Sequence, residues 1–362
     1  MEKLHGSKLR MLAMACLVVL ATALIALAGC AQQSSSTSAA SSATSESSAS
    51  ASSSSASAGL AETDPATVRV ASLKGPTSIG IAKFIDEAAA GETYNDFQFA
   101  ISGTADEVLP NLIQGNVDIA LIPANAAATV YNKTNGGISV IDVNTLGVLY
   151  VVSGDEAISS IKDLAGKTVY MTGAGTTPEY VMNYLLKEAG IAGDVTLEFK
   201  SEASEVAAVL AADPSAIGVL PEPYVTSVTL KTEGLAPRVS LTEEWDALQA
   251  DTSGSQLVTG VTVVRNDFLA ENPAAVADFL ERQAASVELV NADPETAGEL
   301  VVKAGIMDNA KAAAQAIPRC NLVCLTGDKM KNALSGYLSV LFEQDPASVG
   351  GTLPGDDFYF AG

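Results

Sequence analysis

Hydroxyl and amide side chains follow the apolar, β-rich runs of this sequence, at points where helices are expected to begin. Thr77 or Ser78 follows the first run, Thr104 the second and Asn125 the third, and Thr177 follows a later run. Such side chains cap helix N-termini, which carry unpaired backbone N–H groups and a partial positive charge. Four of these termini facing one cleft could hold a carboxylate, sulfonate or phosphate without an arginine. A purely structural capping role is the alternative for each residue.

Other residues of the same loops complete the predicted ligand site. Missing side chains at Gly173 and Gly175 would let a ligand approach the backbone, unless the run is a plain tight turn. Glu222 could accept a hydrogen bond from a ligand amine or ring N–H, unless it is a solvated loop carboxylate. Lys74 could pair with an anionic ligand, unless it is simply hydrated at the surface. Tyr150 could pack against a ring of the ligand, unless it packs in the core. The full predicted ligand-binding set is Lys74, Pro76, Thr77, Ser78, Gly103, Thr104, Asn125, Tyr150, Gly173, Gly175, Thr176, Thr177 and Glu222.

The composition excludes several kinds of chemistry. The only histidine, His5, lies in the N-terminal segment, so the rest of the chain can build no Ser-His-Asp or Cys-His catalytic group and no His-ligated zinc or haem. Carboxylates, lysine or tyrosine could still catalyse a reaction, but no spacing indicates it. We therefore expect a protein that is not an enzyme and has no cofactor or metal. The net charge of −22 repels nucleic acid, so we expect no nucleic-acid partner.

Two cysteines lie four residues apart near the C-terminus. Outside the cell, Cys320 and Cys324 could oxidise to a disulfide. On one continuous helix their geometry would be poor for bridging, and two buried free thiols would be the alternative.

The N-terminus indicates export. A weakly polar to apolar run over residues 11–28 follows three basic residues, Lys3, Lys8 and Arg10. Residues 27–30, Leu-Ala-Gly-Cys, resemble a lipobox, which implies cleavage before Cys30 and attachment of a diacylglycerol to its sulfur. A short transmembrane helix is the alternative. Residues 30–61 are almost wholly Ser and Ala, which favours a flexible tether over an alanine helix. We expect a protein anchored by lipid to the extracytoplasmic side of the cell membrane.

From residue 68 onward, short β-rich runs alternate with amphipathic helical stretches. The alternation is typical of parallel sheets with helices on both faces, and it restarts after residues 161–167. Strands are predicted at residues 68–73, 97–101, 118–122, 168–171, 195–199, 217–220 and 256–264, with two more over 138–152. The ligand crevice of such sheets lies beyond the carboxyl ends of the strands, where the predicted site residues fall. The predicted domains are a signal peptide (1–29), the tether (30–61), a first lobe (62–153), a second lobe (154–255) and a return to the first lobe with C-terminal helices and a tail (256–362).

The order of these features resembles one fold family. Ile-Lys-Asp-Leu-Ala-Gly-Lys at residues 161–167, the loop after the first strand and Pro-Glu-Pro-Tyr at 221–224 resemble type II periplasmic-binding proteins of the nitrate, sulfonate and thiamine-precursor branch. The resemblance covers nearly all of residues 67–345. It implies an α/β fold of two lobes, with mixed, mostly parallel sheets, helices on both faces and a ligand cleft between the lobes.

The same resemblance implies a function. Members of this group are solute-binding lipoproteins that deliver a small-molecule ligand to the permease of an ABC transporter by hinge closure. We expect the ligand to be a small organic anion or a heteroaromatic compound, such as a sulfonate or a thiamine precursor, and the protein to be a monomer. The alternatives are an enzyme on the same fold, similar to a menaquinone-pathway dehydratase, and an extracellular ligand sensor.

Overall fold

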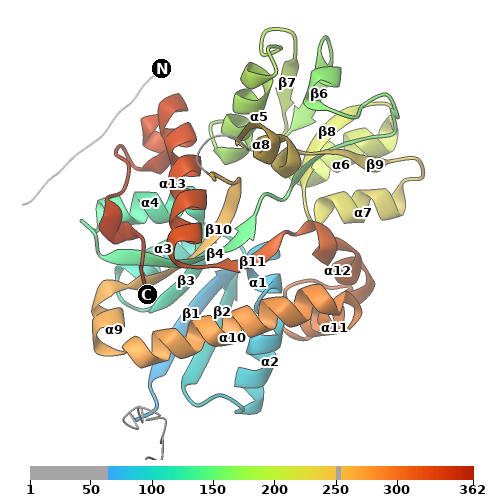
Figure 1. The fold of residues 1–362 in the computed structure, drawn as a ribbon. Coiled ribbons are helices and arrows are strands. Elements are labelled where there is room, and N and C mark those ends of the chain that lie inside the picture. Colours follow the sequence, from blue (N-terminus) through green and yellow to red (C-terminus); the bar gives the residue numbers. More distant parts are fainter. Residues whose placement is uncertain (1–63, 250–253) are drawn as a thin grey trace, which may run out of the picture. The chain divides into compact units, whose positions relative to one another are not determined.

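The computed structural model describes residues 64–249 and 254–362, which form two lobes (Figure 1). They belong to one compact unit, Ala61–Gly362. The predicted signal peptide, the tether and Cys30 lie outside the described residues. Within the described ranges, no helix has both the length and the apolar composition needed to cross a membrane.

The first lobe is built on a six-stranded sheet with the order β11-β4-β10-β3-β1-β2. Strand β1 pairs in parallel with β2 and β3, whereas β10 runs antiparallel to β3 and β4, and β11 antiparallel to β4. The carboxyl ends of β1, β2 and β3 therefore meet at one edge of the sheet. The strands are β1 (Thr67–Leu73), β2 (Asp96–Ser102), β3 (Ile119–Pro123), β4 (Ile138–Leu146), β10 (Val258–Arg265) and β11 (Leu322–Leu325).

Alternating side chains of β3 explain why helices cover both faces of this sheet. Ile119 and Leu121 belong to a cluster with residues of α2 (Ala82–Ala90) and α10 (Pro273–Ala292). Ala120 and Ile122 point to the other face, toward α4 (Ala124–Lys133) and α13 (Gly327–Gln344). A strand buried on both faces reads as a continuous apolar run, and that is how β3 reads.

The second lobe is built on a five-stranded sheet with the order β7-β6-β8-β5-β9. Strand β6 is parallel to β7 and β8, and β5 is antiparallel to β8 and β9. Helices α5 (Thr177–Glu188) and α8 (Leu241–Gln249) pack on one face, and α6 (Ala203–Ala212) and α7 (Tyr224–Lys231) on the other. The strands are β5 (Leu149–Ser153), β6 (Thr168–Met171), β7 (Thr196–Phe199), β8 (Ile217–Pro221) and β9 (Ala236–Ser240).

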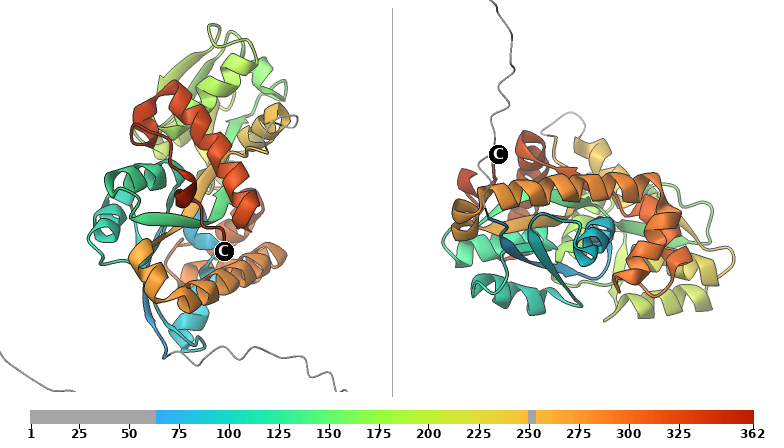
Figure 2. Two further views of the ribbon diagram at one scale, coloured as in Figure 1. Left: turned by 60° about the vertical axis from the view of Figure 1, so that its left-hand side comes forward. Right: turned by 90° about the horizontal axis from the view of Figure 1, so that it is seen from below.

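The remaining elements belong mainly to the first lobe. Figure 2 shows the long helix α10 running across the first sheet, with further helices at its C-terminal end. The shorter elements are α1 (Pro76–Ile79), α3 (Ala105–Ile113), α9 (Asn266–Glu271), α11 (Pro294–Lys303), α12 (Ala310–Ala316) and the 3₁₀ turns η1 (Ile161–Leu164), η2 (Ile317–Arg319), η3 (Pro346–Val349) and η4 (Asp356–Phe358).

The structure confirms the predicted fold class: two lobes, mixed sheets and helices on both faces. Within the described residues four strand pairings are parallel and five antiparallel, because β5, β10 and β11 run against the direction of their neighbours, so the sheets are mixed but not mostly parallel as expected. Strands β9 and β11 were not predicted. The first is short and contains Pro237, and the second lies in a stretch that reads as helix and pairs with β4 far away in the sequence.

The structure corrects the disulfide prediction, because Cys320 and Cys324 are free thiols. Cys320 follows η2 and is buried, while Cys324 lies in β11. An extended chain advances about 3.3 Å per residue, which carries the second thiol away from the first. Burial raises the pKa of both thiols, that of Cys324 to about 12.

Candidate ligand-binding site

A cavity of about 200 Å³ is lined by residues from both sheets. Pro123 ends β3 in the first lobe, Pro221 ends β8 in the second, and Thr172 directly follows β6. The carboxyl ends of parallel strands from both lobes therefore meet at one cavity. This is the place where ligands bind in open α/β sheets.

The segments that connect the lobes form another part of the wall. Val148 and Leu149 lie where the chain passes from β4 to β5, and Leu257 lies where it returns to the first sheet at β10. A molecule in the cavity would therefore touch both lobes and the connections between them.

Two helices begin at the cavity. Asn125 is the second residue of α4, and Thr177 is the first residue of α5; both line the cavity. No side chain caps either N-terminus in the described residues. Uncapped N–H groups and the helix dipole make the start of α4 suitable for a ligand oxygen or a partial negative charge.

The capping predictions need correction. Pro123 and Thr176 occupy the N-cap positions of α4 and α5, and the Thr176 hydroxyl donates to the carbonyl of Gly173 at 2.7 Å instead. Thr104 is at the N-cap position of α3 but makes no capping hydrogen bond. At the start of α5, Glu179 accepts a hydrogen bond from the backbone of Gly175 at 2.6 Å, so this terminus already faces a carboxylate.

The lining of the cavity carries no Asp, Glu, Lys or Arg. Its polar side chains are neutral: Asn125, Thr172, Thr177, Thr259 and Tyr337. The other lining residues are apolar. No group of three or more His, Cys, Asp or Glu residues that could hold a metal ion occurs in the described part of the chain. The cavity therefore suits an organic molecule with an apolar body and few polar atoms.

Sequence reasoning missed every lining residue except Asn125 and Thr177, and Tyr337, on α13, is the most informative of those it missed. Its side chain is 1% exposed, and its hydroxyl has no hydrogen-bond partner among the described residues. Burial raises the pKa of this hydroxyl, and the nearby Thr177 side chain acts in the opposite direction, although the two do not reach hydrogen-bond geometry. The Tyr337 ring packs edge-on against Trp245 at 5.7 Å, and Trp245 packs against Tyr184 of α5 at 4.8 Å. No local pattern in α13 signals a ligand site.

Glu222 is 2% exposed and makes a contact between the lobes. Its Oε1 accepts a hydrogen bond from Arg319 Nε at 2.5 Å, and Arg319 Nη2 donates to the Thr226 hydroxyl at 2.6 Å. The Thr226 hydroxyl in turn donates to Glu222 Oε1 at 3.1 Å, and the backbone N–H of Thr226 donates to Glu222 Oε2 at 3.2 Å. Arg319 lies beside β11 of the first lobe, whereas Glu222 and Thr226 belong to the second. The carboxylate that we predicted to meet a ligand is thus held by protein groups.

Tyr150 belongs to the same contact. Its hydroxyl donates to the carbonyl oxygen of Arg319 at 2.9 Å. Burial, followed by the negative charge of Glu222, raises its pKa to about 12.

The other predicted residues do not line the cavity. The hydroxyls of Thr77 and Ser78 both donate to the carbonyl of Leu73, at 3.1 and 2.6 Å, and so fix the turn after β1. Gly173 and Gly175 have φ angles of 87° and 69°, which indicates a turn that glycine favours. Lys74, Gly103 and Thr104 are exposed and Pro76 is half-buried. Of the predicted set, the structure brings together Asn125 and Thr177 at the cavity.

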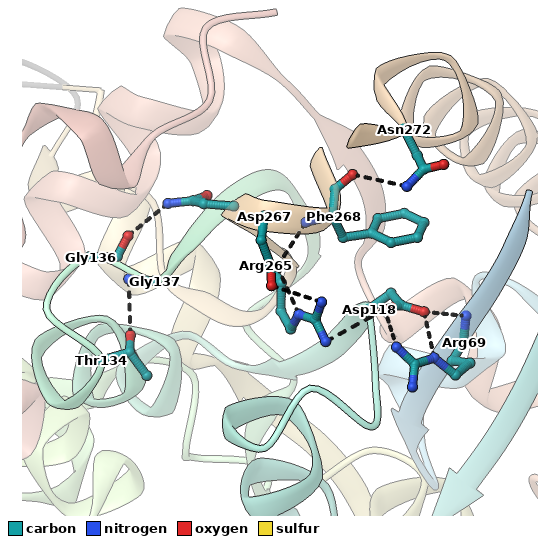
Figure 3. Close-up of polar contacts among 10 residues, drawn as sticks. Arg69, Asp118, Thr134, Gly136, Gly137, Arg265, Asp267, Phe268 and Asn272 are labelled. Carbon is teal, nitrogen blue, oxygen red and sulfur yellow. Dashed lines mark hydrogen bonds and ion pairs between the residues drawn. The ribbon is translucent and has the colours of Figure 1, made fainter. Parts of the chain in front are cut away.

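A second pocket, of about 380 Å³, lies at the opposite edge of the first sheet. Figure 3 shows its charged residues, and each has a partner. Arg265 forms two hydrogen bonds with Asp267, at 2.9 and 3.0 Å, and lies 3.7 Å from Asp118. Asp118 is also bound by the backbone and guanidinium of Arg69, at 2.9 and 2.8 Å. These charges stabilise the ends of β1, β3 and β10.

Several solved structures share this fold. A protein from Parabacteroides distasonis, described as an ABC transporter, is 24% identical with a TM-score of 0.67, over 81% of this chain and 98% of that chain. The periplasmic aliphatic sulphonate binding protein SsuA from Escherichia coli is 13% identical with a TM-score of 0.64, over 82% and 92% of the two chains. The alkanesulfonate-binding protein SsuA from Xanthomonas axonopodis pv. citri, bound to MOPS, is 12% identical with a TM-score of 0.56, over 81% and 96%.

The sequence itself matches a family. No curated protein is similar enough to give a match. Residues 108–297, in contrast, match the family described as NMT1/THI5 like. This match spans more than half of the 362 residues, from α3 of the first lobe through the whole second lobe to α11. The chain therefore belongs to the NMT1/THI5-like family.

Proposed function

We propose that this protein is an extracytoplasmic solute-binding protein that delivers a small organic molecule to the permease of an ABC importer. The observation that carries the proposal is the cavity at which strand ends of both lobes and two helix N-termini meet. Two of the structural relatives are named as sulfonate-binding proteins, one of them bound to MOPS, which supports this reading.

The lining favours a particular kind of ligand. Its apolar residues suit a hydrocarbon chain or a heteroaromatic ring, and the start of α4 suits one polar or acidic group. A small inorganic anion such as nitrate would find no cationic side chain in this lining. We therefore propose an organic anion or a heteroaromatic compound.

The proposed mechanism is closure of the two lobes around the ligand. A ligand that contacts both lobes stabilises the closed state by the free energy of the contacts made only there. The Glu222–Arg319 pair crosses between the lobes and would form as they approach. The domain bounds 62–153, 154–255 and 256–362 remain predictions, although β5 (Leu149–Ser153) pairs within the second sheet, which puts the first crossing between the lobes before residue 149.

The proposal includes the cellular location. A lipid on Cys30 would hold the protein at the extracytoplasmic face of the membrane, and residues 30–61 would let the folded part reach the permease. The support is the sequence of residues 27–30 and the basic and apolar segments before it. We propose that the protein acts as a monomer and not as an enzyme.

A thermal-shift screen of a chain that begins at residue 62 tests the proposal. The panel holds sulfonates, nitrate, thiamine precursors, flavins, amino acids and short organic acids. Binding to the folded state raises the Tm, and we expect an organic anion or a heteroaromatic compound to do so.

Matched variants locate the site. The shift should shrink in Asn125→Ala and Thr177→Ala, which line the cavity, and persist in Thr104→Ala, which does not. A panel without any shift would contradict the proposal, and slow consumption of one compound would indicate an enzyme instead.

A further inference from the structure

The hydroxyl group of Tyr337 occupies an unusual position. It lies on α13 of the first lobe, near Thr177 at the start of α5 in the second, and both residues line the cavity. The hydroxyl is buried. Among the residues that the structure describes, none accepts a hydrogen bond from it or donates one to it.

Such a position needs an explanation. A buried hydroxyl that loses water and gains no partner destabilises the fold, and phenylalanine would fill the same space without this cost. Buried tyrosines usually find a partner for the O–H group. Tyr150 illustrates the usual case, because its hydroxyl donates to the carbonyl oxygen of Arg319 at 2.9 Å.

We infer that the Tyr337 hydroxyl binds the ligand, by donating a hydrogen bond to an uncharged acceptor atom such as a ring nitrogen or a carbonyl oxygen. This inference rests on the proposed function and narrows its ligand class. Tyr337 and Thr177 come from different lobes, so an acceptor placed between them would join the lobes through a single atom.

The neutrality of the acceptor follows from the lining. No lining side chain carries a positive charge, so an anionic atom beside Tyr337 would lie in an apolar wall without charge compensation. Glu179 adds a carboxylate at the start of α5, which disfavours an anion at this end of the cavity. An acidic group, if the ligand has one, would fit better at the start of α4, which has no acidic residue in its first turn.

Two ring compounds of the same size test the inference. 4-Methylpyridine carries one acceptor atom that toluene lacks, and both can be offered to the chain from residue 62 at a pH where the pyridine is uncharged. Trp245, the only tryptophan, packs against Tyr337 and should report binding through its emission. Calorimetry gives a second measure of each Kd.

The informative quantity is the ratio of the two dissociation constants. We expect Tyr337→Phe to weaken the binding of 4-methylpyridine, relative to the binding of toluene, by about fivefold, which is the effect of one neutral hydrogen bond. The Tm of the ligand-free protein should stay the same or rise, because no protein partner is lost. Tyr150→Phe is the matched control: it should lower the Tm and leave the ratio unchanged.

Two results would overturn the inference. One is an unchanged ratio in Tyr337→Phe, and the other is a fall in Tm like that of Tyr150→Phe, which would reveal a structural hydrogen bond. Failure of both rings to bind the unmodified chain would be a third result that overturns it. The proposed function fails separately, when no compound of the thermal-shift panel binds.

Discussion

The two ends of strands β3, β4 and β10 carry two different kinds of pocket. At one end, Arg265 lines the larger pocket and binds both Asp118 and Asp267. At the other end, Pro123 and Thr259 line the smaller cavity, which has no charged side chain and contains an unpartnered hydroxyl. The larger volume is therefore not the better ligand site. Polar groups that already have partners hold a fold together, whereas polar groups without them are available to a ligand.

The largest expected effect tests whether an unpartnered polar atom always signals a ligand site. Asp142 lies inside β4, away from both pockets; one of its oxygens accepts from Gln283 at 2.9 Å, and the other has no partner in the described residues. Burial raises its pKa to about 7, against the opposing effect of the nearby Thr262 and Gln283 side chains. Because Asp142 lines neither of the two pockets, we expect this residue to affect stability and not ligand binding.

The direction of the pH effect on stability follows from the pKa of Asp142 in the folded state and its pKa in the unfolded state. The folded state holds the Asp142 proton more tightly than the unfolded state, so the free energy of unfolding should fall as the pH rises from about 4 to about 7. The loss should reach about 4 kcal/mol, and Asp142→Asn should remove it. Urea unfolding at several pH values measures the difference between the two proteins. Equal pH slopes, or a changed ligand affinity, would contradict the expectation.

The next effect concerns the charged pocket. Asp118 is 2% exposed and serves two arginines, of which Arg265 is 16% exposed. Asp118→Ala leaves both cations without this partner and should lower the free energy of unfolding by about 3 kcal/mol, with ligand affinity unchanged. Asp267→Ala is the milder control, because its carboxylate is 67% exposed and exposed pairs contribute little. Chemical denaturation and ligand titration separate the outcomes; a loss of binding would mean that the two ends of the sheet are coupled.

The smallest effect concerns the contact between the lobes. Glu222 and Arg319 should couple by about 2 kcal/mol in a double-mutant cycle of Glu222→Gln and Arg319→Gln. If the pair forms on closure, each variant should also weaken the ligand found in the thermal-shift screen, because the closed state becomes less populated. Stability and Kd are measured on the four proteins. Normal affinity with reduced stability would show that the pair is purely structural.

The sequence predicted what depends on local patterns. The apolar runs of residues 118–122 and 168–171 predicted strands β3 and β6, and the strand-to-helix loops predicted where a cleft would lie. The sequence placed polar side chains correctly at the starts of α4 and α5. The N-cap positions, however, belong to Pro123 and Thr176, so Asn125 and Thr177 face the cavity instead of capping the helices. One position along the chain changes the direction of a side chain, and propensity does not resolve such a shift.

Contacts between distant segments were beyond sequence reasoning. Nothing near Glu222 signals Arg319, which lies 97 residues away and reaches it only because β11 pairs with β4. Likewise, Tyr337 reads as one apolar position of an amphipathic helix, and only the packing of α13 beside α5 reveals its hydroxyl as unpartnered.

The two connecting segments beside the cavity have a mechanical consequence. Val148, Leu149 and Leu257 lie where any rotation of one lobe against the other would be absorbed, and they also touch the space that a ligand fills. If the lobes close as proposed, a bound compound acts as a spacer at the pivot. A molecule one carbon too long could bind well and still hold the lobes at the wrong angle for the permease. Selection of cargo would then depend on the angle at which the protein stops as well as on affinity.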